Sequence, residues 1–244
     1  ELEAISGQKG GPSIKDELNK LKAKSTKQLK DIYSDLSAWR KTQVARHPDR
    51  PHLSDYIDTI FEDFEELAGD RLFGKAVRLM DMAEKFNLPV LSFPDTAGAY
   101  PGKGGEERGQ AEAISRGTQR GLSLGVPFVT LIIGEGMSGG AIGIAAATTV
   151  LMMEHAIYSV ISPEGCASIL YRDPAKARDA ADAMKITAPD LLKTKVIDGV
   201  VKEPVGGAHR DPQRAMAAAA KALDTALKDL EGMSPQELRR QRRD

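Results

Sequence analysis

Two glycine-containing loops carry the residues of this sequence that are best suited to chemistry. The first comprises residues 134–140, which follow the apolar run 126–133 and precede a stretch of small residues. Glycine permits tight turns and close approach of a ligand to the main chain, and the first N–H groups of a helix have no partner within it. Such a loop suits a negatively charged oxygen, either of a phosphate or of an enolate or ureido group that gains charge during a reaction.

The second loop comprises residues 95–102 and stands in the same context as the first. An apolar run, 89–93, precedes it, and a helical pattern over about 106–124 follows it. Two strand–loop–helix units of this kind place two sets of main-chain N–H donors near one face of a parallel sheet.

A nucleotide-binding alternative rests on the first loop. Gly134, Gly136 and Gly139 match the pattern G-x-G-x-x-G, and Glu154 lies 20 residues after Gly134, where a dinucleotide-binding fold keeps its ribose-binding carboxylate. These letters favour an NAD-dependent oxidoreductase, although glycines that merely allow close packing give the same pattern. The second loop weighs against the dinucleotide-binding alternative. The G-x-G-x-x-G pattern usually follows the first strand of its domain, whereas here another strand–loop–helix unit precedes it.

The elements that must position the loops are read from hydrophobic periodicity. Apolar residues at helical spacing, broken by prolines at 48 and 51, predict a helical arm over 13–46. We therefore divide the chain into an N-terminal helical arm, 1–52, and an α/β domain, 53–244. Within that domain the patterns predict helices at 53–68, 75–86, 106–124, 141–147, 174–184, 188–195 and 213–231, and strands at 89–93, 126–133, 150–153 and 158–161.

Composition excludes several other classes. The 34 basic and 35 acidic residues leave a net charge of -1, and aromatic residues make up 5%, so no nucleic-acid surface is expected. The single cysteine, Cys166, excludes an intrachain disulfide and is expected to be a buried thiol. No apolar run approaches the roughly 20 residues of a membrane span, so we expect a soluble, intracellular protein. The basic run 239–243 is expected to be a solvated helix end.

Several segments resemble the carboxyltransferase alpha subunits of multi-subunit acetyl-CoA carboxylase, of the bacterial and plastid type. They occur in the expected order along nearly the whole chain, at residues 45–48, 69–71, 93–102, 106–110, 133–141, 158–167 and 203–210. The resemblance implies a crotonase-like (ClpP/crotonase) spiral of ββα units. It also implies the transfer of a carboxyl group from carboxybiotin to acetyl-CoA, which forms malonyl-CoA for fatty acid synthesis.

The resemblance further implies partners. We expect an α2β2 heterotetramer whose beta subunit carries zinc and binds most of the CoA. A biotin carboxyl carrier protein, together with the biotin carboxylase and ATP binding of the whole complex, completes the expected assembly. The expected location is the cytoplasm, or the plastid stroma in a plant. An idle subunit that only scaffolds its partner remains an alternative.

No side-chain base is needed for this chemistry, because the biotin nitrogen can take the acetyl proton. We therefore predict main-chain catalysis, with N–H groups of Gly139 and Gly140 as oxyanion donors. The other predicted site residues, with no metal ligand among them, are Gly98 and Ala99 lining the site, and Gly136, Met137, Ser138, Tyr100 and Arg108 binding substrate. Ser138 has a helix-capping role as its alternative, and Arg108 an exposed position or a salt bridge.

The sequence departs from the family pattern in two places. After Phe73 the family continues with a strand-rich stretch, whereas this chain passes almost at once to the helical pattern at Lys75. A spiral without those strands leaves neighbouring strands unpaired and a core face exposed, so we expect a segment to be missing near residues 73–75. Met137 stands where the family usually has glycine, and we expect it to narrow the pocket.

Overall fold

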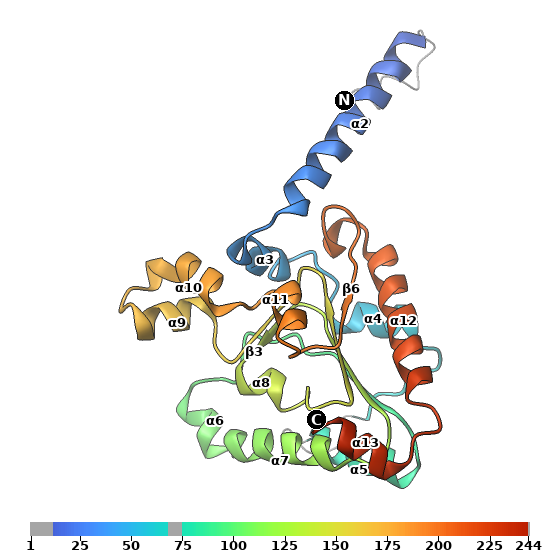
Figure 1. Cartoon of the computed structure of the whole chain (residues 1–244), viewed down its shortest axis with the longest axis vertical. Helices are drawn as coiled ribbons and strands as arrows, with labels where there is room; N and C mark the ends of the chain where they lie inside the picture. Colours follow the sequence, from blue (N-terminus) through green and yellow to red (C-terminus); the bar gives the residue numbers. More distant parts are fainter. Residues whose placement is uncertain (1–11, 68–74, 244) are drawn as a thin grey trace.

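The structure is a computed structural model of the chain and describes residues 12–67 and 75–243 (Figure 1). Residues 69–71, which contribute to the family resemblance, lie outside this part. The helices are α2 (Pro12–Ser34), α3 (Ala38–Ala45), α4 (Leu53–Ile60), α5 (Lys75–Lys85), α6 (Lys103–Glu107), α7 (Gln110–Ser123), α8 (Ser138–Ile142), α9 (Pro163–Leu170), α10 (Ala177–Met184), α11 (Ala188–Lys193), α12 (Pro212–Asp229) and α13 (Pro235–Gln241). The strands are β1 (Val90–Ser92), β2 (Phe128–Ile132), β3 (Glu135–Met137), β4 (Thr149–Met153), β5 (Ile157–Ser159) and β6 (Gly199–Val201), and short 3-10 turns lie at Pro174–Lys176 and Ala208–Arg210.

All strand pairs of the two sheets are parallel. The larger sheet has the order β1-β2-β4-β6, and the smaller sheet pairs β3 with β5. A unit therefore repeats along the chain: one strand enters the larger sheet, a short strand enters the smaller sheet, and a helix follows. β2, β3 and α8 form one unit, and β4, β5 and α9 form the next. The predicted α/β spiral of ββα units is confirmed.

The core forms where the larger sheet meets α12. Every residue of β2 is buried, as its continuous apolar run predicts for a strand covered on both faces. α12 presents small and apolar residues at helical spacing toward the sheet, namely Ala215, Ala219, Leu223 and Ala226, and these belong to the same buried cluster as Val129 and Leu131. The small alanine side chains let the helix approach the sheet closely.

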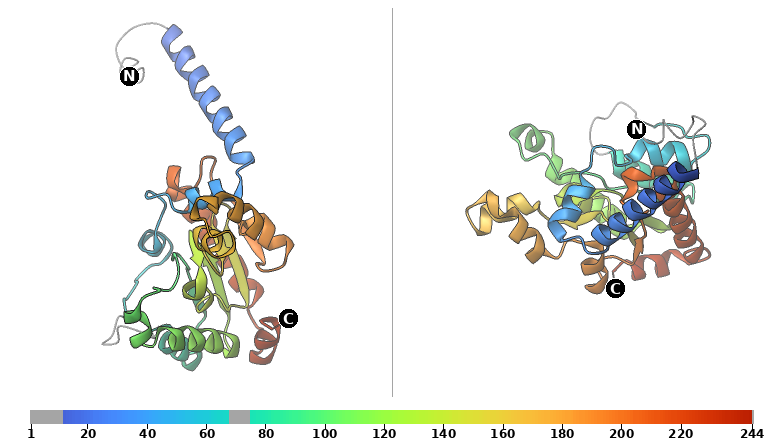
Figure 2. Two further views of the ribbon diagram at one scale, coloured as in Figure 1. Left: turned by 90° about the vertical axis from the view of Figure 1, so that its left-hand side faces the viewer. Right: turned by 90° about the horizontal axis from the view of Figure 1, so that it is seen from above.

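The predicted arm is two helices rather than one. The helix breaks after Ser34, and the Ser37 hydroxyl accepts the N–H of Arg40 (3.4 Å) to begin α3, because serine caps helices better than it continues them. α2 leads away from the rest of the molecule with Leu21 and Ile32 exposed (Figures 1 and 2). α3 instead packs against the domain, in a cluster with Met137 and Ile157.

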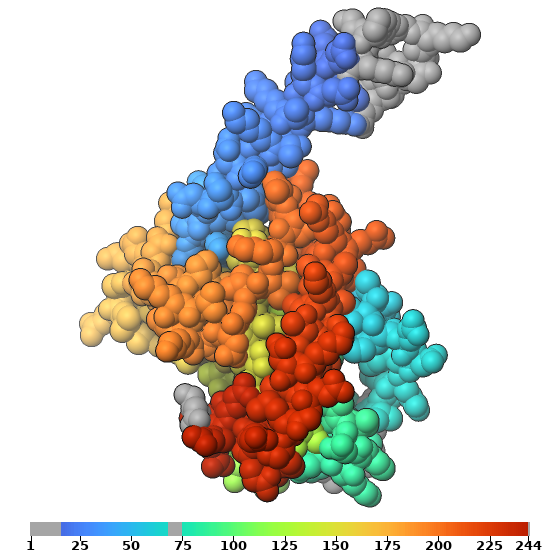
Figure 3. Space-filling model, turned by 45° about the vertical axis from the view of Figure 1, so that its right-hand side comes forward, coloured from blue at the N-terminus to red at the C-terminus, as the bar shows by residue number. Residues whose placement is uncertain are grey.

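The prediction of a solvated basic end is wrong for Arg239 and Arg242. In Figure 3 the C-terminal segment lies directly against the body of the molecule. Arg242 of this segment is half-buried and donates hydrogen bonds to the carbonyl of Val126 (2.5 Å), to the hydroxyl of Thr148 (2.7 Å) and to the carbonyl of Leu124. Burial lowers the pKa of Arg242 to about 10. Arg242 therefore pins α13 to the strand ends, whereas Arg240 and Arg243 are exposed.

Other differences from the predictions are local. The helix expected over 106–124 is divided into α6 and α7 by Gly109, whose φ is 70°. α9, β6 and α13 were not predicted as separate elements, and β3 lies inside the predicted glycine loop.

Candidate functional site

The two glycine loops lie side by side. The Thr96 N–H donates to the Glu135 carbonyl (2.6 Å), and the Met137 N–H donates to the Thr96 carbonyl (3.0 Å). Thr96 and Gly136 thus form a parallel bridge that extends the smaller sheet. The expectation that both loops meet at one face is confirmed, although the contact is made by strand pairing that the sequence did not indicate.

Glycine is required where the loops touch. A Cβ added to Gly98, whose φ is 127°, would lie 3.0 Å from the Cβ of Ser138. A Cβ on Gly140 would lie 3.3 Å from both the Ala99 nitrogen and the Gly98 carbonyl carbon. Both distances are tighter than ordinary van der Waals contact, so side chains at these positions would force the loops apart.

Gly139 and Gly140 belong to the first turn of α8. Groups at this position have no intrahelical acceptor for their N–H. Both residues are partly exposed, and α8 begins at Ser138, which adopts a φ of 57° that is uncommon for a residue with a side chain. The backbone therefore turns abruptly at the point where the predicted donors stand.

Gly136 and Met137 have a different position from the one expected. Gly136 is buried in β3, where a Cβ would meet the Tyr158 ring at 2.9 Å. The Met137 side chain is fully buried and packs with Ala38 and Ile186. Met137 therefore joins α3 to the domain core, and its side chain does not narrow an open pocket.

Tyr100 and Arg108 lie on the surface. The Tyr100 side chain is 68% exposed, while its main chain is clamped by the Gln110 amide through two hydrogen bonds of 3.1 and 2.9 Å. Arg108 is exposed at the C-terminal end of α6. The structure thus brings Gly98, Ala99, Ser138, Gly139 and Gly140 together, with Tyr100 next to this group in sequence and Arg108 farther along the chain.

Ion pairs and hydrogen bonds of charged side chains fix the positions of the two glycine loops. Arg46 bridges Glu135 in the first loop (2.7 Å) and Glu164 at the start of α9 (2.6 Å). The Asp95 carboxylate accepts the N–H of Glu135 (3.1 Å), which adds a side-chain link between the two loops. The Arg46 guanidinium holds the pKa of Glu164 below its ordinary value, against the effect of burial.

A buried ion pair anchors the strand that leads into the first loop. The side chains of Arg50 and Glu203 are 2% and 0% exposed, and Arg50 also donates to the Ile133 carbonyl (2.7 Å) immediately before Gly134. Glu203 accepts the N–H groups of His155 (2.9 Å) and Ala208 (2.7 Å) as well. Burial opposes ionisation of Glu203, yet the Arg50 charge keeps its pKa below the ordinary value.

The nucleotide-binding alternative is not supported by this arrangement. The segment after Gly134 enters β3 instead of turning directly into a helix. The carboxylate of Glu154 is already used, because it accepts the Glu203 N–H (3.1 Å) and pairs with Lys202 (2.7 Å). Burial disfavours the charged form of Glu154, but these hydrogen bonds hold its pKa below the ordinary value. Glu154 thus ties the end of β4 to the end of β6.

Cys166 is a buried, free thiol, as expected. Within residues 12–67 and 75–243, no group of three or more His, Cys, Asp or Glu side chains is placed to hold a metal ion. The same residues include no helix long and apolar enough to cross a membrane.

The sequence reasoning missed the charged residues that support the loops. Arg46, Arg50, Asp95 and Glu203 were not predicted as site residues, although three of them fall inside or next to the segments that carry the family resemblance. The sequence does indicate part of this. Glu203 follows an apolar strand and Arg50 lies between two prolines, so neither charge belongs to the solvent-exposed face of a helix.

Comparison with known proteins agrees with this geometry. The sequence pattern of the family described as "Acetyl co-enzyme A carboxylase carboxyltransferase-like" matches residues 1–75 and 73–244. A relative from Azorhizobium caulinodans, named acetyl-coenzyme A carboxylase carboxyl transferase subunit alpha, is 49% identical over 288 aligned positions, which cover 100% of this chain and 91% of the relative. A relative of the same name from Methylobacterium nodulans is 50% identical, and the alignment covers 99% of this chain and 90% of the relative.

Solved structures show the same fold. A Pseudomonas malonate decarboxylase hetero-tetramer in complex with coenzyme A aligns with a TM-score of 0.58 at 15% identity, covering 68% of each chain. Transcarboxylase 12S aligns with a TM-score of 0.54 at 18% identity, and the match covers 64% of this chain but 30% of the transcarboxylase chain. These alignments show that the chain shares the crotonase-like fold of these proteins. The sequence matches, which span the whole chain, and the paired glycine loops together show that this chain belongs to the acetyl co-enzyme A carboxylase carboxyltransferase-like family.

Proposed function

We propose that the chain is the alpha subunit of an acetyl-CoA carboxylase carboxyltransferase. It transfers the carboxyl group of carboxybiotin to acetyl-CoA and so forms malonyl-CoA, the committed step toward fatty acids. The observation that carries this proposal is the pairing of the two glycine loops through Thr96, which puts main-chain N–H groups from both near one another. The names of the full-length relatives support it.

The residues of this chain act through their main chain in the proposed reaction. N–H groups of Gly139 and Gly140 stabilise one oxyanion, either the thioester enolate oxygen or the biotin ureido oxygen, as its charge develops. Gly98 and Ala99 line the opposite side, and Ser138 and Tyr100 are positioned to contact the substrates. The proton step is assigned to no side chain of this chain, since the basic biotin nitrogen supplies that chemistry when bound.

The proposed assembly has partners. The designation "subunit alpha" of the relatives supports a second, beta subunit, and we propose an α2β2 complex served by a biotin carboxyl carrier protein and a biotin carboxylase. We propose, as the family resemblance implies, that the expected zinc is carried by the beta subunit. The proposed location is the cytoplasm, or the stroma of a plastid.

We also propose that a segment is absent between the two matched parts of the chain, near residues 73–75. Two observations support it: the family match divides at this point, and the relative from Azorhizobium caulinodans aligns over 288 positions against 244 residues of this chain.

Reconstitution tests the proposed function. The chain is mixed with the beta subunit of the Azorhizobium caulinodans enzyme and with carboxylated carrier protein, and malonyl-CoA is measured. Gly140→Val keeps the main-chain N–H, but its side chain meets Gly98 and Ala99 and should displace that donor. Formation should fall about 100-fold, the scale of losing an oxyanion donor, while the pair still co-purifies. Gly104→Ala is the control, because a Cβ there meets open space.

Three results would count against the proposal. Unchanged activity in both Gly140→Val and Gly139→Val would favour an idle scaffolding subunit. Saturable NADH fluorescence transfer would favour the oxidoreductase. A co-purifying pair that forms no malonyl-CoA would exclude the proposed transfer.

A further inference from the structure

The second glycine loop is tied to β3 at its amino-terminal end. Thr96 pairs through its main chain with Glu135 and Met137, and its hydroxyl accepts the Gly98 N–H (3.1 Å). Gly98 itself restrains the chain weakly, because glycine permits many backbone conformations. Ala99 lies beyond the paired part of the loop, so its position depends on contacts made farther along the chain.

Gln110, the first residue of α7, makes such a contact. Its side-chain amide binds both polar main-chain groups of Tyr100: it accepts the Tyr100 N–H (3.1 Å) and donates to the Tyr100 carbonyl (2.9 Å). Two hydrogen bonds from one planar amide fix both the position and the orientation of this main chain. Because the peptide bond is planar, they also orient the carbonyl of Ala99, which lines the proposed site.

α6 packs closely against this pair of hydrogen bonds at Gly105. Gly105 is buried, and a Cβ there would lie 3.0 Å from the Tyr100 carbonyl oxygen and 3.2 Å from the Gln110 Nε2. A Cβ on the neighbouring Gly104 would meet no atom within 4 Å. A side chain at position 105 would therefore push apart the two partners of one hydrogen bond, whereas a side chain at position 104 would not.

The face of α7 that carries Gln110 also contacts α8, which follows the first loop and lies beside α7 in Figure 1. Ile114 lies one turn after Gln110 on the same face, and a Cβ on Gly139 would lie 3.0 Å from the Ile114 Cδ1. One turn farther, a Cβ on Gly117 would lie 2.5 Å from the Gly143 carbonyl oxygen. One face of α7 thus contacts both loop units.

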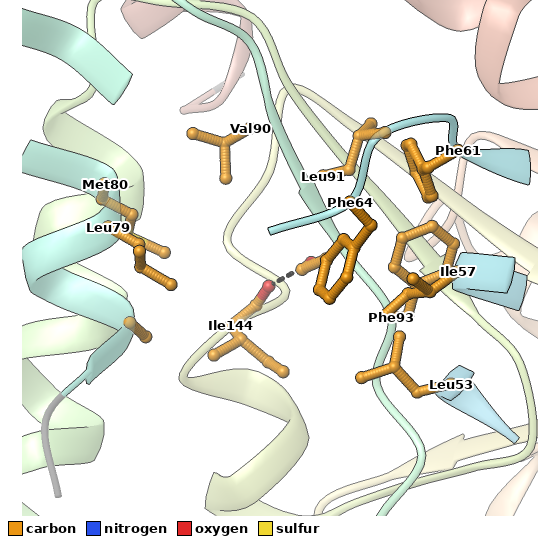
Figure 4. Close-up of a pocket in the computed structure, with 12 residues that line it drawn as sticks. Leu53, Ile57, Phe61, Phe64, Leu79, Met80, Val90, Leu91, Phe93 and Ile144 are labelled. Carbon is orange, nitrogen blue, oxygen red and sulfur yellow. Dashed lines mark hydrogen bonds between the residues drawn. The ribbon is translucent and has the colours of Figure 1, made fainter. Parts of the chain in front are cut away.

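α8 is also fixed to the larger sheet. The Ile144 carbonyl, two residues after α8, accepts the Ser92 hydroxyl of β1 (2.6 Å), which is the dashed line in Figure 4. The Thr130 hydroxyl of β2 donates to the same carbonyl (3.3 Å). These contacts hold α8 independently of the second loop. A displacement of Ala99 would therefore change its separation from Gly140.

We infer that Gln110 is a positioning residue for the proposed carboxyl transfer. Its amide holds the peptide between Ala99 and Tyr100 in place opposite Gly140, and so sets the separation between the two sides of the site. Gln110 acts through the second loop and is assigned no contact with the substrates. This inference rests on the proposed function, and it assigns Gln110 an effect on turnover that is separate from folding and from subunit assembly.

Gln110→Met tests the inference, because Met is similar in length and suits a helix but cannot donate to the Tyr100 carbonyl. In the reconstituted pair with the Azorhizobium caulinodans beta subunit, kcat for malonyl-CoA formation should fall about tenfold or more, the scale expected for displaced reacting groups. KM for acetyl-CoA should change by less than about twofold, because ground-state binding is kept. Gln119→Met, at an exposed position of the same helix, is the matched control and should change neither quantity.

Gly105→Ala disturbs the same hydrogen bonds from α6 and leaves Gln110 in place. It should lower kcat in the same way, whereas Gly104→Ala should not. Gly105→Ala combined with Gln110→Met should lose little more than Gln110→Met alone, because both changes act on one contact. Equal losses of kcat in Gly104→Ala and Gly105→Ala would contradict the inference.

Amide hydrogen exchange of the same pairs provides a measurement that does not depend on activity. The Tyr100 N–H should exchange at least about fivefold faster in Gln110→Met than in the original chain, because its acceptor is lost. Exchange at Leu131 in the buried strand β2 should stay the same. Faster exchange at both positions would indicate general destabilisation and would overturn the assignment of a local positioning role.

The activity results separate this inference from the proposed function. An original pair that forms malonyl-CoA, together with a Gln110→Met pair of unchanged kcat, would overturn the inference alone. A Gln110→Met chain that loses activity because it no longer co-purifies with the beta subunit would do the same. An original pair that forms no malonyl-CoA would overturn the proposed function, and this inference with it.

Discussion

Arg50 and Glu203, 153 positions apart in the sequence, form a two-pronged ion pair with nitrogen–oxygen distances of 2.7 and 3.0 Å in the interior of the protein. Arg50 also holds the Ile133 carbonyl, and Glu203 also holds the N–H groups of His155 and Ala208. This pair therefore joins the segment after α3, the end of β2, the turn after β4 and the segment after β6. The first glycine loop begins at Gly134, directly after Ile133, whose carbonyl accepts the hydrogen bond from Arg50.

Loss of the Arg50 side chain is expected to be strongly destabilising. Arg50→Met leaves the Glu203 carboxylate buried without a countercharge, which should lower the free energy of unfolding by about 3–5 kcal/mol. Arg50→Lys keeps the charge but loses the two-pronged geometry, so its free energy of unfolding should lie between those of the original protein and Arg50→Met. Denaturant unfolding measures the change, with the exposed Arg40→Met as a control that should stay within about 0.5 kcal/mol of the original. Equal stability of Arg50→Met and Arg40→Met would show that the pair is not the anchor described.

Stability should fall as the pH drops below neutral. Burial lowers the pKa of His155 below its ordinary 6.5, so the unfolded chain binds a proton there before the folded chain does. The stability that this buried neutral ring provides is complete above about pH 6.5 and is lost progressively as the pH falls from that value toward the lower folded-state pKa. His209, also lowered first by burial, acts in the same direction. Unfolding measured from pH 8 to pH 5 should show a shallower loss in His155→Gln, and an identical slope in both proteins would contradict this assignment.

A second loss is expected at lower pH. The pKa of Glu203 lies below its ordinary 4.5, so its contribution is complete above about pH 4.5 and disappears as the pH falls through the folded-state pKa. In Glu203→Gln the starting stability should be lower and this acid step should be absent. Acid titration of both proteins by circular dichroism checks the prediction, which fails if the step survives in Glu203→Gln.

The contact between the glycine loops can be tested at Gly98. Gly98→Ala combines an unfavourable φ with a Cβ 3.0 Å from that of Ser138, so it should cost about 1–3 kcal/mol of stability. It should also lower the rate of malonyl-CoA formation more than the affinity for the beta subunit. Gly104→Ala, on nearby α6, should change neither quantity, and a Gly98→Ala protein with full activity would remove Gly98 from the site.

The C-terminal helix should depend on one arginine. Arg242→Ala removes the donor to the carbonyls of Leu124 and Val126, and leaving such acceptors unpaired should cost about 1–3 kcal/mol. Arg243→Ala, one residue later and exposed, should cost less than about 0.5 kcal/mol. Thermal unfolding of the two variants distinguishes a pinned helix from a solvated one.

The sequence predicted those parts of the fold that local patterns specify. The continuous apolar run of β2 and the helical spacing of apolar residues in α12 were enough to predict these two elements. In each case the pattern of apolar residues within the element itself indicates which of its faces are buried. β3 was missed because three residues that include Gly136 have little strand propensity; hydrogen bonds from Thr96 and from β5 create the strand. The positions of Gly98 and Gly140 followed from two loops at the ends of parallel strands, whereas Arg50 and Glu203 could not be paired without knowing the topology.

The bridge between Thr96 and Gly136 has a consequence for selectivity. Neighbouring strands stand about 4.8 Å apart, and this interval is common to all peptide chains, whatever side chains they carry. The separation between the two loops is therefore fixed by this backbone pairing. In the proposed reaction, a substrate that binds both loops would have to present its acceptor atoms at a matching interval, and exchange of the surrounding surface residues would leave that interval unchanged.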